Sequence, residues 1–328
     1  MSEGPAAPFV STGRLPPAEL VRELVDEAYR RFRSTTDGQN ANVYPALAAV
    51  DPELFGLCVV GVDGASYAVG DADRGFAIMS ASKPFVFAMA CETLGPEAAR
   101  ARLGVNATGL PFNSIAAIER SGDGRTNPMV NSGAIAATSL VPGTDLEDRW
   151  HRIRDGLSRF AARELALDEP VYASSSRTNL RNQAIARVLA TYGALYLDPV
   201  EATELYTRQC ALEVTARDLA VMGATLADGG VNPLTRERVV GETACRHALA
   251  VMATAGMYET SGDWLYDIGL PGKSGIGGGI FMVSPGKGAL GTYSPRLDAA
   301  GNSVRGQLAA RFLSEQLGLS LFASRPEP

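Results

Sequence analysis

The sequence predicts an α+β fold in which one antiparallel sheet is assembled from both ends of the chain. Two hairpin patterns support this prediction, one after an N-terminal helical pattern and one before a C-terminal helical pattern. The long segment between them has mainly helical periodicity. We therefore expect a single domain, residues 1–328, with a sheet subdomain from residues 1–79 and 265–328 and a mostly helical subdomain from residues 80–264.

The N-terminal part of the chain predicts one helix and one hairpin. Apolar side chains recur at helical spacing over residues 16–34, which indicates an amphipathic helix. Residues 57–62 and 66–70 are strand-like and flank Asp63 and Gly64. An Asp-Gly pair between two such runs is a strong hairpin signal.

The rest of the chain predicts further helices and a second hairpin. Thr215 and Asp218 resemble a capping box at the start of a helix. A Pro-Gly-Lys-Gly turn separates two strand-like runs near the C-terminus. The other expected elements are helices around residues 146–160, 185–192 and 304–317 and strands over residues 280–284 and 289–293.

Composition bounds the function. The 328 residues are 46% hydrophobic with a net charge of −6, which argues against a nucleic-acid-binding surface. No apolar run approaches the roughly 18–20 residues of a membrane span. The first 13 residues have neither a basic region nor an apolar core, so they do not resemble a secretory signal. We expect a cytoplasmic protein that binds neither nucleic acid nor a membrane.

Ser80 and Lys83 are the candidate nucleophile and base. The apolar run of residues 76–79 ends at Ser80, and Lys83 begins an apolar segment expected to be helical. Residues at i and i+3 share one face of a helix. Burial and the positive end of the helix dipole both lower a lysine pKa, and a neutral amine can take the serine proton. Ser-x-x-Lys alone also fits an ordinary helix start with an exposed lysine.

Lysine is scarce in this chain. Only Lys83, Lys273 and Lys287 occur among 30 lysine and arginine residues. Arginine keeps its proton in proteins whereas a buried lysine can lose it, so a retained lysine marks a place where a titratable amine is needed. Lys273 opens a Lys-Ser-Gly triplet, and Lys287 lies at the expected hairpin tip. Ser-x-x-Lys and Lys-Ser/Thr-Gly are signatures of serine β-lactamases and penicillin-binding proteins, so the pair favours an active serine at Ser80.

Other catalytic chemistries have few candidate residues. The only histidines are His151 and His247, so neither a Ser-His-Asp triad nor a histidine zinc site is expected. No Cys-x-x-Cys pair occurs, and we expect buried, reduced thiols. The cysteines are Cys58, Cys91, Cys210 and Cys245. A base is therefore expected from lysine, with no metal and no cofactor.

Several longer stretches resemble the serine-dependent glutaminases. They are NPMVNSGAI (127–135), YTRQCALEVT (206–215), the run that ends GLPGKSGIGGGIFMVSPGKG (256–288) and the setting of residues 80–84. The similarity spans roughly residues 42–305, with the motifs in the same order. The resemblance implies a β-lactamase-like fold and cofactor-free hydrolysis of the side-chain amide of L-glutamine to glutamate and ammonia.

By this resemblance, Ser80 is the nucleophile, Lys83 is its base, and the backbone amides of Ser80 and Ile276 form an oxyanion hole. The glycines near Ile276 fit this role because they let backbone approach a ligand closely. The resemblance also implies a small-molecule substrate, a homodimer or homotetramer, and a proton relay through Tyr258. The implied substrate contacts are Asn131, Asn182, Tyr206 and Tyr258, although the asparagines taken singly also fit loop caps and Tyr206 a core position.

Two positions depart from the family pattern. The segment before the first strand usually reads Tyr-Ile-Pro, but here it reads Val43-Tyr44-Pro45, so the tyrosine hydroxyl is expected elsewhere. Ser175 stands seven residues before Asn182, where the family has a glutamate that pairs with the substrate's α-ammonium. A serine does not neutralise that charge, and losing one partner of a buried pair costs about 2–5 kcal/mol.

Four functions remain compatible with the sequence. The leading one is a glutaminase that acts through an acyl-Ser80 intermediate. The second is an amidase of the same scaffold whose substrate lacks a free α-ammonium. The third is a binding module with feeble catalysis, which the retention of Lys83 disfavours. A penicillin-binding or β-lactamase role is the least favoured, because it normally requires export.

Overall fold

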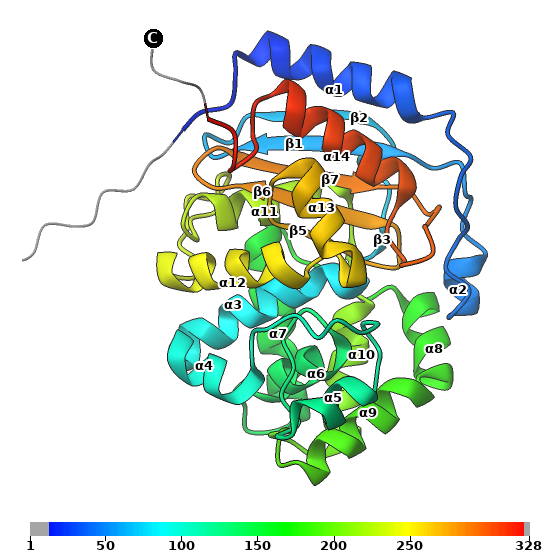
Figure 1. Ribbon diagram of the computed structural model, residues 1–328, viewed down its shortest axis with the longest axis vertical. Coiled ribbons are helices and arrows are strands. Elements are labelled where there is room, and N and C mark those ends of the chain that lie inside the picture. Colours follow the sequence, from blue (N-terminus) through cyan, green and yellow to red (C-terminus); the bar gives the residue numbers. More distant parts are fainter. Residues whose placement is uncertain (1–12, 325–328) are drawn as a thin grey trace, which may run out of the picture.

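The computed structural model describes residues 13–324 and contains a five-stranded antiparallel sheet built from both ends of the chain (Figure 1). The strand order is β2-β1-β7-β6-β5. The two halves join where β1 pairs with β7, with Gly56 opposite Tyr293. The strands are β1 (Gly56–Gly61), β2 (Ser66–Gly70), β5 (Gly272–Ser274), β6 (Gly279–Ser284) and β7 (Gly288–Tyr293). The predicted α+β class and the assembly of the sheet from both chain ends are confirmed.

Both predicted hairpins are present. The β1–β2 turn contains Asp63 and Gly64, and the Asp63 carboxylate accepts a hydrogen bond from the backbone of Ala65 (3.0 Å). Gly64 has a φ of +84°, a left-handed conformation that glycine adopts without strain. The β6–β7 turn contains Gly286, whose φ is +74°. Turn chemistry therefore fixes the register of both strand pairs.

Helices cover both faces of the sheet. α1 (Ala18–Phe32) and α14 (Val304–Gln316) pack together over one face; in Figure 1, α1 lies at the top and α14 runs in front of the strands. α11 (Ala216–Ala227) packs against β1, β6 and β7. Val59 belongs to the apolar cluster under α1 and α14, whereas the next residue, Val60, belongs to the cluster with α11. Since successive side chains of a strand alternate between faces, the two layers lie on opposite sides.

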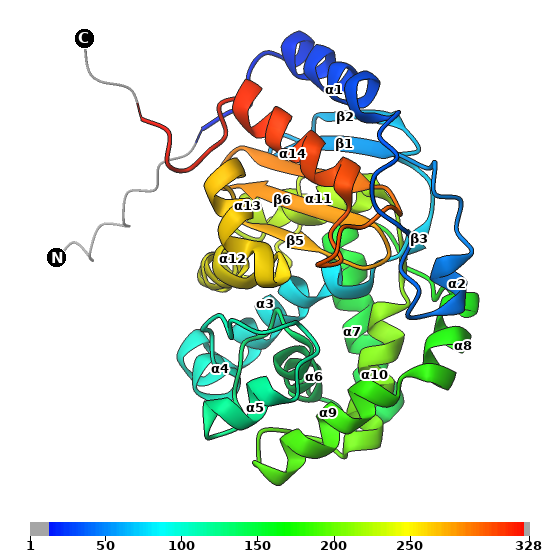
Figure 2. The ribbon, with the colours of Figure 1, turned by 45° about the vertical axis from the view of Figure 1, so that its right-hand side comes forward.

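α13 (Ser261–Ile268) lies beside α14 on the first face, most of the other helices form a second mass beside the sheet, and α3 (Lys83–Leu94) runs between the sheet and this mass (Figures 1 and 2). The capping box of Thr215 and Asp218 at the start of α11 is confirmed. α11 lies within the segment expected to form the helical subdomain, but it packs on the sheet. The proposed division of the chain near residues 80 and 265 stays a prediction. The remaining helices are α2 (Pro45–Ala48), α4 (Pro96–Leu103), α5 (Ala116–Ser121), α6 (Asn131–Ser139), α7 (Leu146–Ala161), α8 (Glu169–Thr178), α9 (Leu180–Thr191), α10 (Pro199–Cys210) and α12 (Glu242–Ala255).

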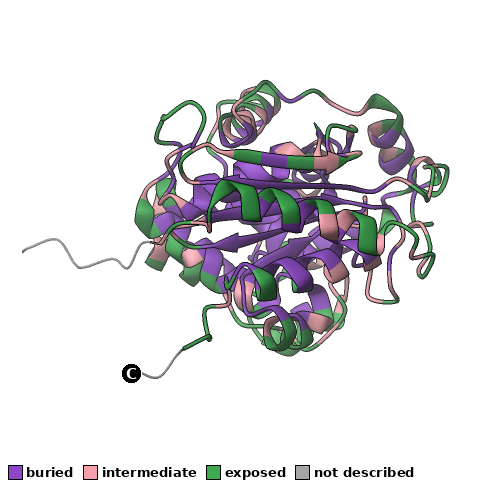
Figure 3. Ribbon diagram, turned by 90° about the horizontal axis from the view of Figure 1, so that it is seen from above, coloured by how far each residue is buried: buried purple, intermediate pink, exposed green. Residues whose placement is uncertain are grey.

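The interior is apolar and closely filled. Strands β1, β6 and β7 are buried along their whole length, while the outer sides of the covering helices are exposed (Figure 3). The four cysteines are free and buried, as predicted. No helix among residues 13–324 is both long and apolar enough to cross a bilayer. The predicted lack of a secretory signal concerns residues that fall almost wholly outside the described range.

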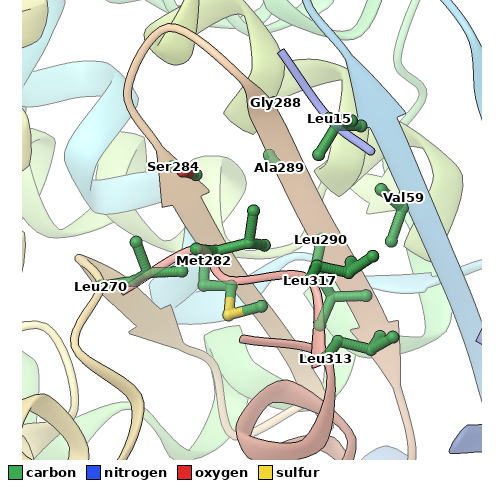
Figure 4. A pocket seen from close by; sticks show the side chains of 11 residues that line it. Leu15, Val59, Leu270, Met282, Ser284, Gly288, Ala289, Leu290, Leu313 and Leu317 are labelled. Atoms are coloured by element: carbon green, nitrogen blue, oxygen red, sulfur yellow. The ribbon is translucent and has the colours of Figure 1, made fainter. Parts of the chain in front are cut away.

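A small void lies between the sheet and α14, lined by apolar side chains such as Met282, Leu290 and Leu313 (Figure 4). Its volume is about 10 Å³, which is at most the room that one water molecule needs. The void is therefore a packing defect of the core and not a ligand site.

Candidate active site

Ser80 lies where the chain turns sharply from a strand into a helix. β3 (Phe76–Ala77) pairs with β4 (Glu213–Val214), and the Ile78 amide donates to the Leu212 carbonyl (2.8 Å). Because these bonds hold the strand end, the turn is made at Met79, whose φ of +49° is strained for a bulky residue. Ser80 follows in the 3-10 turn η1 (Met79–Ser82) and is 6% exposed.

The start of this helix differs from the expected one. The sequence predicts a continuous α-helix from Ser80, but the α-helix α3 begins only at Lys83. A 3-10 turn has three residues per turn, so side chains at i and i+3 still lie above one another. The shared face of Ser80 and Lys83 is therefore preserved by a different local geometry.

The Lys83 amine is buried and fully engaged as a donor. The side chain is 1% exposed, and Nζ donates to Oδ1 of Asn131 (2.7 Å) and to the Met129 carbonyl (3.2 Å). Burial lowers the pKa of Lys83 to about 7, with a smaller opposing contribution from Cys210. A neutral amine has two N–H groups and one lone pair. Since the two hydrogen bonds use both N–H groups, the lone pair remains free to accept a proton.

Asn131 connects the lysine to two further predicted site residues. Its Nδ2 donates to Oδ1 of Asn182 (2.9 Å), and the Tyr206 hydroxyl donates to its Oδ1 (3.3 Å). These residues come from α6, α9 and α10, so the network joins three helices at one point. Asn131 and Asn182 thus bond to each other and not to a helix terminus. Burial, followed by Cys210, raises the pKa of Tyr206, which keeps the phenol neutral.

Tyr258 approaches from the sheet side. It starts the short turn η2 (Tyr258–Thr260) with a φ of +57° and is 6% exposed. Its hydroxyl donates to the Ser274 carbonyl (3.1 Å). Burial raises the pKa of Tyr258, while hydrogen bonding with Ser80 and Ser274 acts in the opposite direction. The tyrosine is therefore a neutral O–H donor beside the candidate nucleophile.

The end of β5 lies directly against the backbone of η1. A Cβ at Gly275 would lie 2.8 Å from the Ile78 carbonyl and 3.4 Å from the Ser80 amide nitrogen, so glycine is required for this approach. The amides of Gly275 and Gly278 are used within the following turn. Between them, the Ile276 amide has no hydrogen-bond acceptor among the described residues. The Ser80 and Ile276 backbones are thus neighbours, as an oxyanion hole requires.

A cavity of about 80 Å³ opens at Ser80. Lys83 and Tyr258 adjoin it through their contacts with Asn131 and Ser80. Four further residues line the cavity although no sequence motif indicated a role for them: Phe112, Asn179, Thr207 and Cys210. The predicted residues among its walls are Val43, Ser80, Asn131, Ser175, Asn182, Tyr206 and Ile276.

The two family departures lie at this same cavity. Val43 is 58% exposed at its rim, whereas Tyr44 is buried and lines the wall. Burial, followed by Cys210, raises the pKa of Tyr44 to about 12. Ser175 is buried on α8, and its hydroxyl donates to the Tyr172 carbonyl (3.1 Å). Within residues 13–324, no group of three or more His, Cys, Asp or Glu side chains is placed to hold a metal ion.

A series of buried side-chain hydrogen bonds that no sequence motif predicted supports the turn η1, which carries Ser80. The Gln209 amide donates to the Ser82 hydroxyl (2.9 Å), which donates in turn to the Met79 carbonyl (2.8 Å). The Thr138 hydroxyl donates to the other end of Gln209 (2.8 Å). Gln209 lies in the run 206–215, but its residue type alone does not distinguish a buried glutamine from an exposed one.

The fold and the residues around the cavity are those of a β-lactamase-like hydrolase with a serine and a lysine at its centre. The family model Glutaminase matches residues 38–322, and the chain belongs to the glutaminase family. It is 65% identical to Glutaminase 2 of Yersinia pestis, with 97% of this chain and 94% of that protein covered. It is 46% identical to a glutaminase of Colwellia psychrerythraea, with coverages of 94% and 99%.

Solved structures agree with this assignment. The chain superposes with a TM-score of 0.93 on a protein described as probable glutaminase ybaS, at 45% identity. The superposition covers 94% of this chain and all of that one. It superposes with a TM-score of 0.83 on a Bacillus glutaminase, at 31% identity, with coverages of 94% and 100%. These likenesses confirm the resemblance and the fold inferred from the sequence motifs.

Proposed function

We propose that this protein hydrolyses the side-chain amide of L-glutamine to L-glutamate and ammonia through an acyl-Ser80 intermediate. The observation that carries the proposal is the buried Lys83 amine, which keeps a lone pair one turn from Ser80. Membership of the glutaminase family and the 65% identity to Glutaminase 2 of Yersinia pestis support the substrate. The activity is that of an amidohydrolase.

Acylation begins when Ser80 Oγ attacks the carboxamide carbon and Lys83 Nζ takes the hydroxyl proton. A lysine pKa of about 7 makes the amine a competent base near neutral pH. The tetrahedral intermediate places a negative charge on the former carbonyl oxygen. We assign its stabilisation to the amides of Ser80 and Ile276, which need no reorganisation because the glycine turn fixes them.

The C–N bond then breaks, and the departing nitrogen takes a proton to leave as ammonia. We assign the donor role to Tyr258, whose hydroxyl is protonated and adjacent to Ser80, and whose proton turns from the Ser274 carbonyl to the departing nitrogen. The proton that Lys83 received replaces the one that Tyr258 gives up. A water molecule attacks the acyl-Ser80 ester by the reverse path, which releases glutamate and restores Ser80. Asn131, Asn182 and Tyr206 are proposed to bind the substrate at the cavity wall.

The direct test compares ammonia release from glutamine by the wild-type protein and by Ser80→Ala. We expect the variant to lose activity completely, with unchanged thermal unfolding. A wild-type protein that releases ammonia no faster than Ser80→Ala contradicts the proposal. Mass spectrometry of the wild type with an electrophilic glutamine analogue gives an independent readout, because the label is expected on Ser80.

A second candidate substrate class is suggested by Ser175. Its hydroxyl proton is used by the Tyr172 carbonyl, so the oxygen presents acceptor lone pairs to the cavity. An acceptor without charge suits the N–H of an acylated nitrogen as well as an ammonium. The only charged side chain among the cavity's described lining residues is Arg181, which favours a carboxylate. Acylated glutamines are therefore the alternative substrates.

Competition between glutamine and N-acetylglutamine decides between these classes. A kcat/KM ratio that favours N-acetylglutamine supports the alternative, and one that favours glutamine contradicts it. Ser175→Glu adds a carboxylate to the cavity and is expected to move the ratio towards glutamine. Ala173→Glu is a matched control, because it places the same group on an exposed position of α8.

The cytoplasmic location and the homodimeric or homotetrameric assembly remain predictions from the sequence. Size-exclusion chromatography with light scattering tests the assembly.

A further inference from the structure

Lys273 is a buried amine to which the proposed reaction gives no task. It lies on β5, its side chain is 0% exposed, and Nζ donates to the Ser274 carbonyl (2.6 Å). Desolvating an amine costs free energy even in its neutral form, and much more if it is protonated. Methionine or leucine would fill the same volume without this cost, so the position calls for a specific use of the amine.

Tyr258 is a close neighbour of this amine. Nζ of Lys273 lies 4.3 Å from the centre of the Tyr258 ring. The Tyr258 hydroxyl donates to the same Ser274 carbonyl that accepts from Lys273. The ring also contacts Phe112, with ring centroids 4.6 Å apart. The tyrosine is thus held at its hydroxyl and at its ring by groups from two separate segments.

Tyr258 needs such support because its own backbone is strained. A φ of +57° is unfavourable for a bulky residue and persists only when surrounding contacts enforce it. We propose that Lys273 is a positioning residue for Tyr258, which holds the phenol so that its proton is delivered to the departing nitrogen. This inference rests on the proposed function, since it concerns the step in which ammonia leaves.

The charge state of the amine fits this role. Burial, followed by the nearby Lys83, lowers the pKa of Lys273 well below its usual value, which favours the neutral amine. One of its two N–H groups bonds to the Ser274 carbonyl, and the other is available to the electron-rich face of the phenol ring. A neutral amine also leaves the Tyr258 pKa high, so the tyrosine keeps its proton until ammonia leaves.

The experiment separates proton delivery from other effects by changing the leaving group. Kinetics are measured on glutamine and on the corresponding γ-(4-nitrophenyl) ester of glutamate, whose phenolate leaves without a proton. Lys273→Met is expected to lower kcat on glutamine by at least about 30-fold, which is part of the roughly 10²–10⁴-fold that acid catalysis contributes, and to change KM by less than about 3-fold. For the ester, kcat/KM reports acylation alone, in which the leaving phenolate needs no proton, and it should fall less than about 3-fold. Lys287→Met removes the third lysine, at the hairpin tip, and is the matched control.

The double variant Lys273→Met/Tyr258→Phe tests whether the two residues act as a unit. We expect it to be no slower on glutamine than Tyr258→Phe alone, because the amine has nothing to position once the hydroxyl is gone. Multiplicative losses, or equal losses of Lys273→Met on amide and ester, overturn the proposal. If Lys273→Met does not fold, Lys273→Gln keeps an N–H donor, and the same amide-to-ester comparison applies. The proposed function can fail separately. If the wild type cleaves the ester but not glutamine, and Ser80→Ala loses ester cleavage, the result contradicts only the proposed function.

Discussion

Nζ of Lys83 lies 2.7 Å from Oδ1 of Asn131, so the partner of this buried amine is an amide and not a carboxylate. A carboxylate at this distance would hold the lysine protonated, because opposite charge favours the ionised form. The neutral amide instead accepts an N–H without stabilising the ammonium. The network therefore orients the amine while burial keeps its pKa about 7.

The activity is expected to rise with pH through about 7. Lys83 acts as a base only when deprotonated, and its amine loses its proton as the pH rises past a pKa of about 7. The measurement is kcat/KM for glutamine between pH 5.5 and pH 9 in buffers of constant ionic strength. Lys83→Met should lower kcat/KM by on the order of 10²–10⁴-fold across that range, since general base catalysis contributes about this much. A flat profile for the wild type contradicts the role of Lys83.

Asn131→Asp should move this profile towards higher pH. The substitution places a carboxylate within hydrogen-bond reach of Lys83, and such a neighbour raises the lysine pKa by about 1–3 units. The pH at which kcat/KM reaches half its maximum is the readout, because it is independent of any general loss of activity. Asn182→Asp is the control, since the structure gives that side chain no hydrogen bond to Lys83. Equal shifts in both variants would speak against direct coupling to Lys83.

Gly275→Ala is expected to impair catalysis more than binding. The added Cβ would meet the Ile78 carbonyl at 2.8 Å, which forces β5 away from the Ser80 backbone. Displacing one oxyanion donor lowers kcat by about 10²–10³-fold. Steady-state kinetics on glutamine and chemical denaturation check the result.

Gly262→Ala is the matched control for that change. Gly262 lies in α13 and has no atom within 4 Å of the added Cβ, so alanine should raise stability by up to about 1 kcal/mol through helix propensity. Its kcat should equal that of the wild type. A Gly275→Ala enzyme with wild-type kcat would contradict the proposed oxyanion hole.

Local patterns predicted most of the fold. The Asp63-Gly64 turn, the Pro-Gly-Lys-Gly turn and the capping box at Thr215 each act through neighbours in the chain, and the structure contains all three. The 3-10 turn at Ser80 was not predictable in this way. It arises because pairing of β3 with β4 and the bond from Ile78 to Leu212 fix the strand end, a tertiary constraint that overrides helix propensity.

The contacts of the candidate site were less predictable than its residues. Lys83 meets Asn131 across 48 positions and Gln209 meets Ser82 across 127, so the sequence shows the residues but not the pairs. The resemblance pointed to only part of the residues that line the cavity, and their catalytic and binding roles remain proposals. The juxtaposition of Lys273 and Tyr258 depends on the tertiary packing that brings η2 beside β5.

Arg305 is expected to be a main source of stability for the segment that carries Val43 and Tyr44. The arginine is 0% exposed on α14, and its guanidinium donates to the Thr35 carbonyl (2.7 Å) and to both the carbonyl and the carboxylate of Glu53 (3.0 and 2.8 Å). Arg305→Met should lower the free energy of unfolding by about 1–3 kcal/mol, because it leaves partly buried carbonyls without donors. Urea denaturation followed by circular dichroism measures this change.

Arg311→Met on the same helix is the control for Arg305→Met. Arg311 is 59% exposed and pairs at the surface with Asp267 (3.4 Å), so its loss should cost less than about 1 kcal/mol. Because residues 35–53 bring Val43 and Tyr44 to the cavity, Arg305→Met should also raise KM for glutamine more than it lowers kcat. Equal stabilities of the two variants would show that the bonds of Arg305 do not hold this segment. A loss of kcat with unchanged KM would instead place its effect at Ser80 and Lys83.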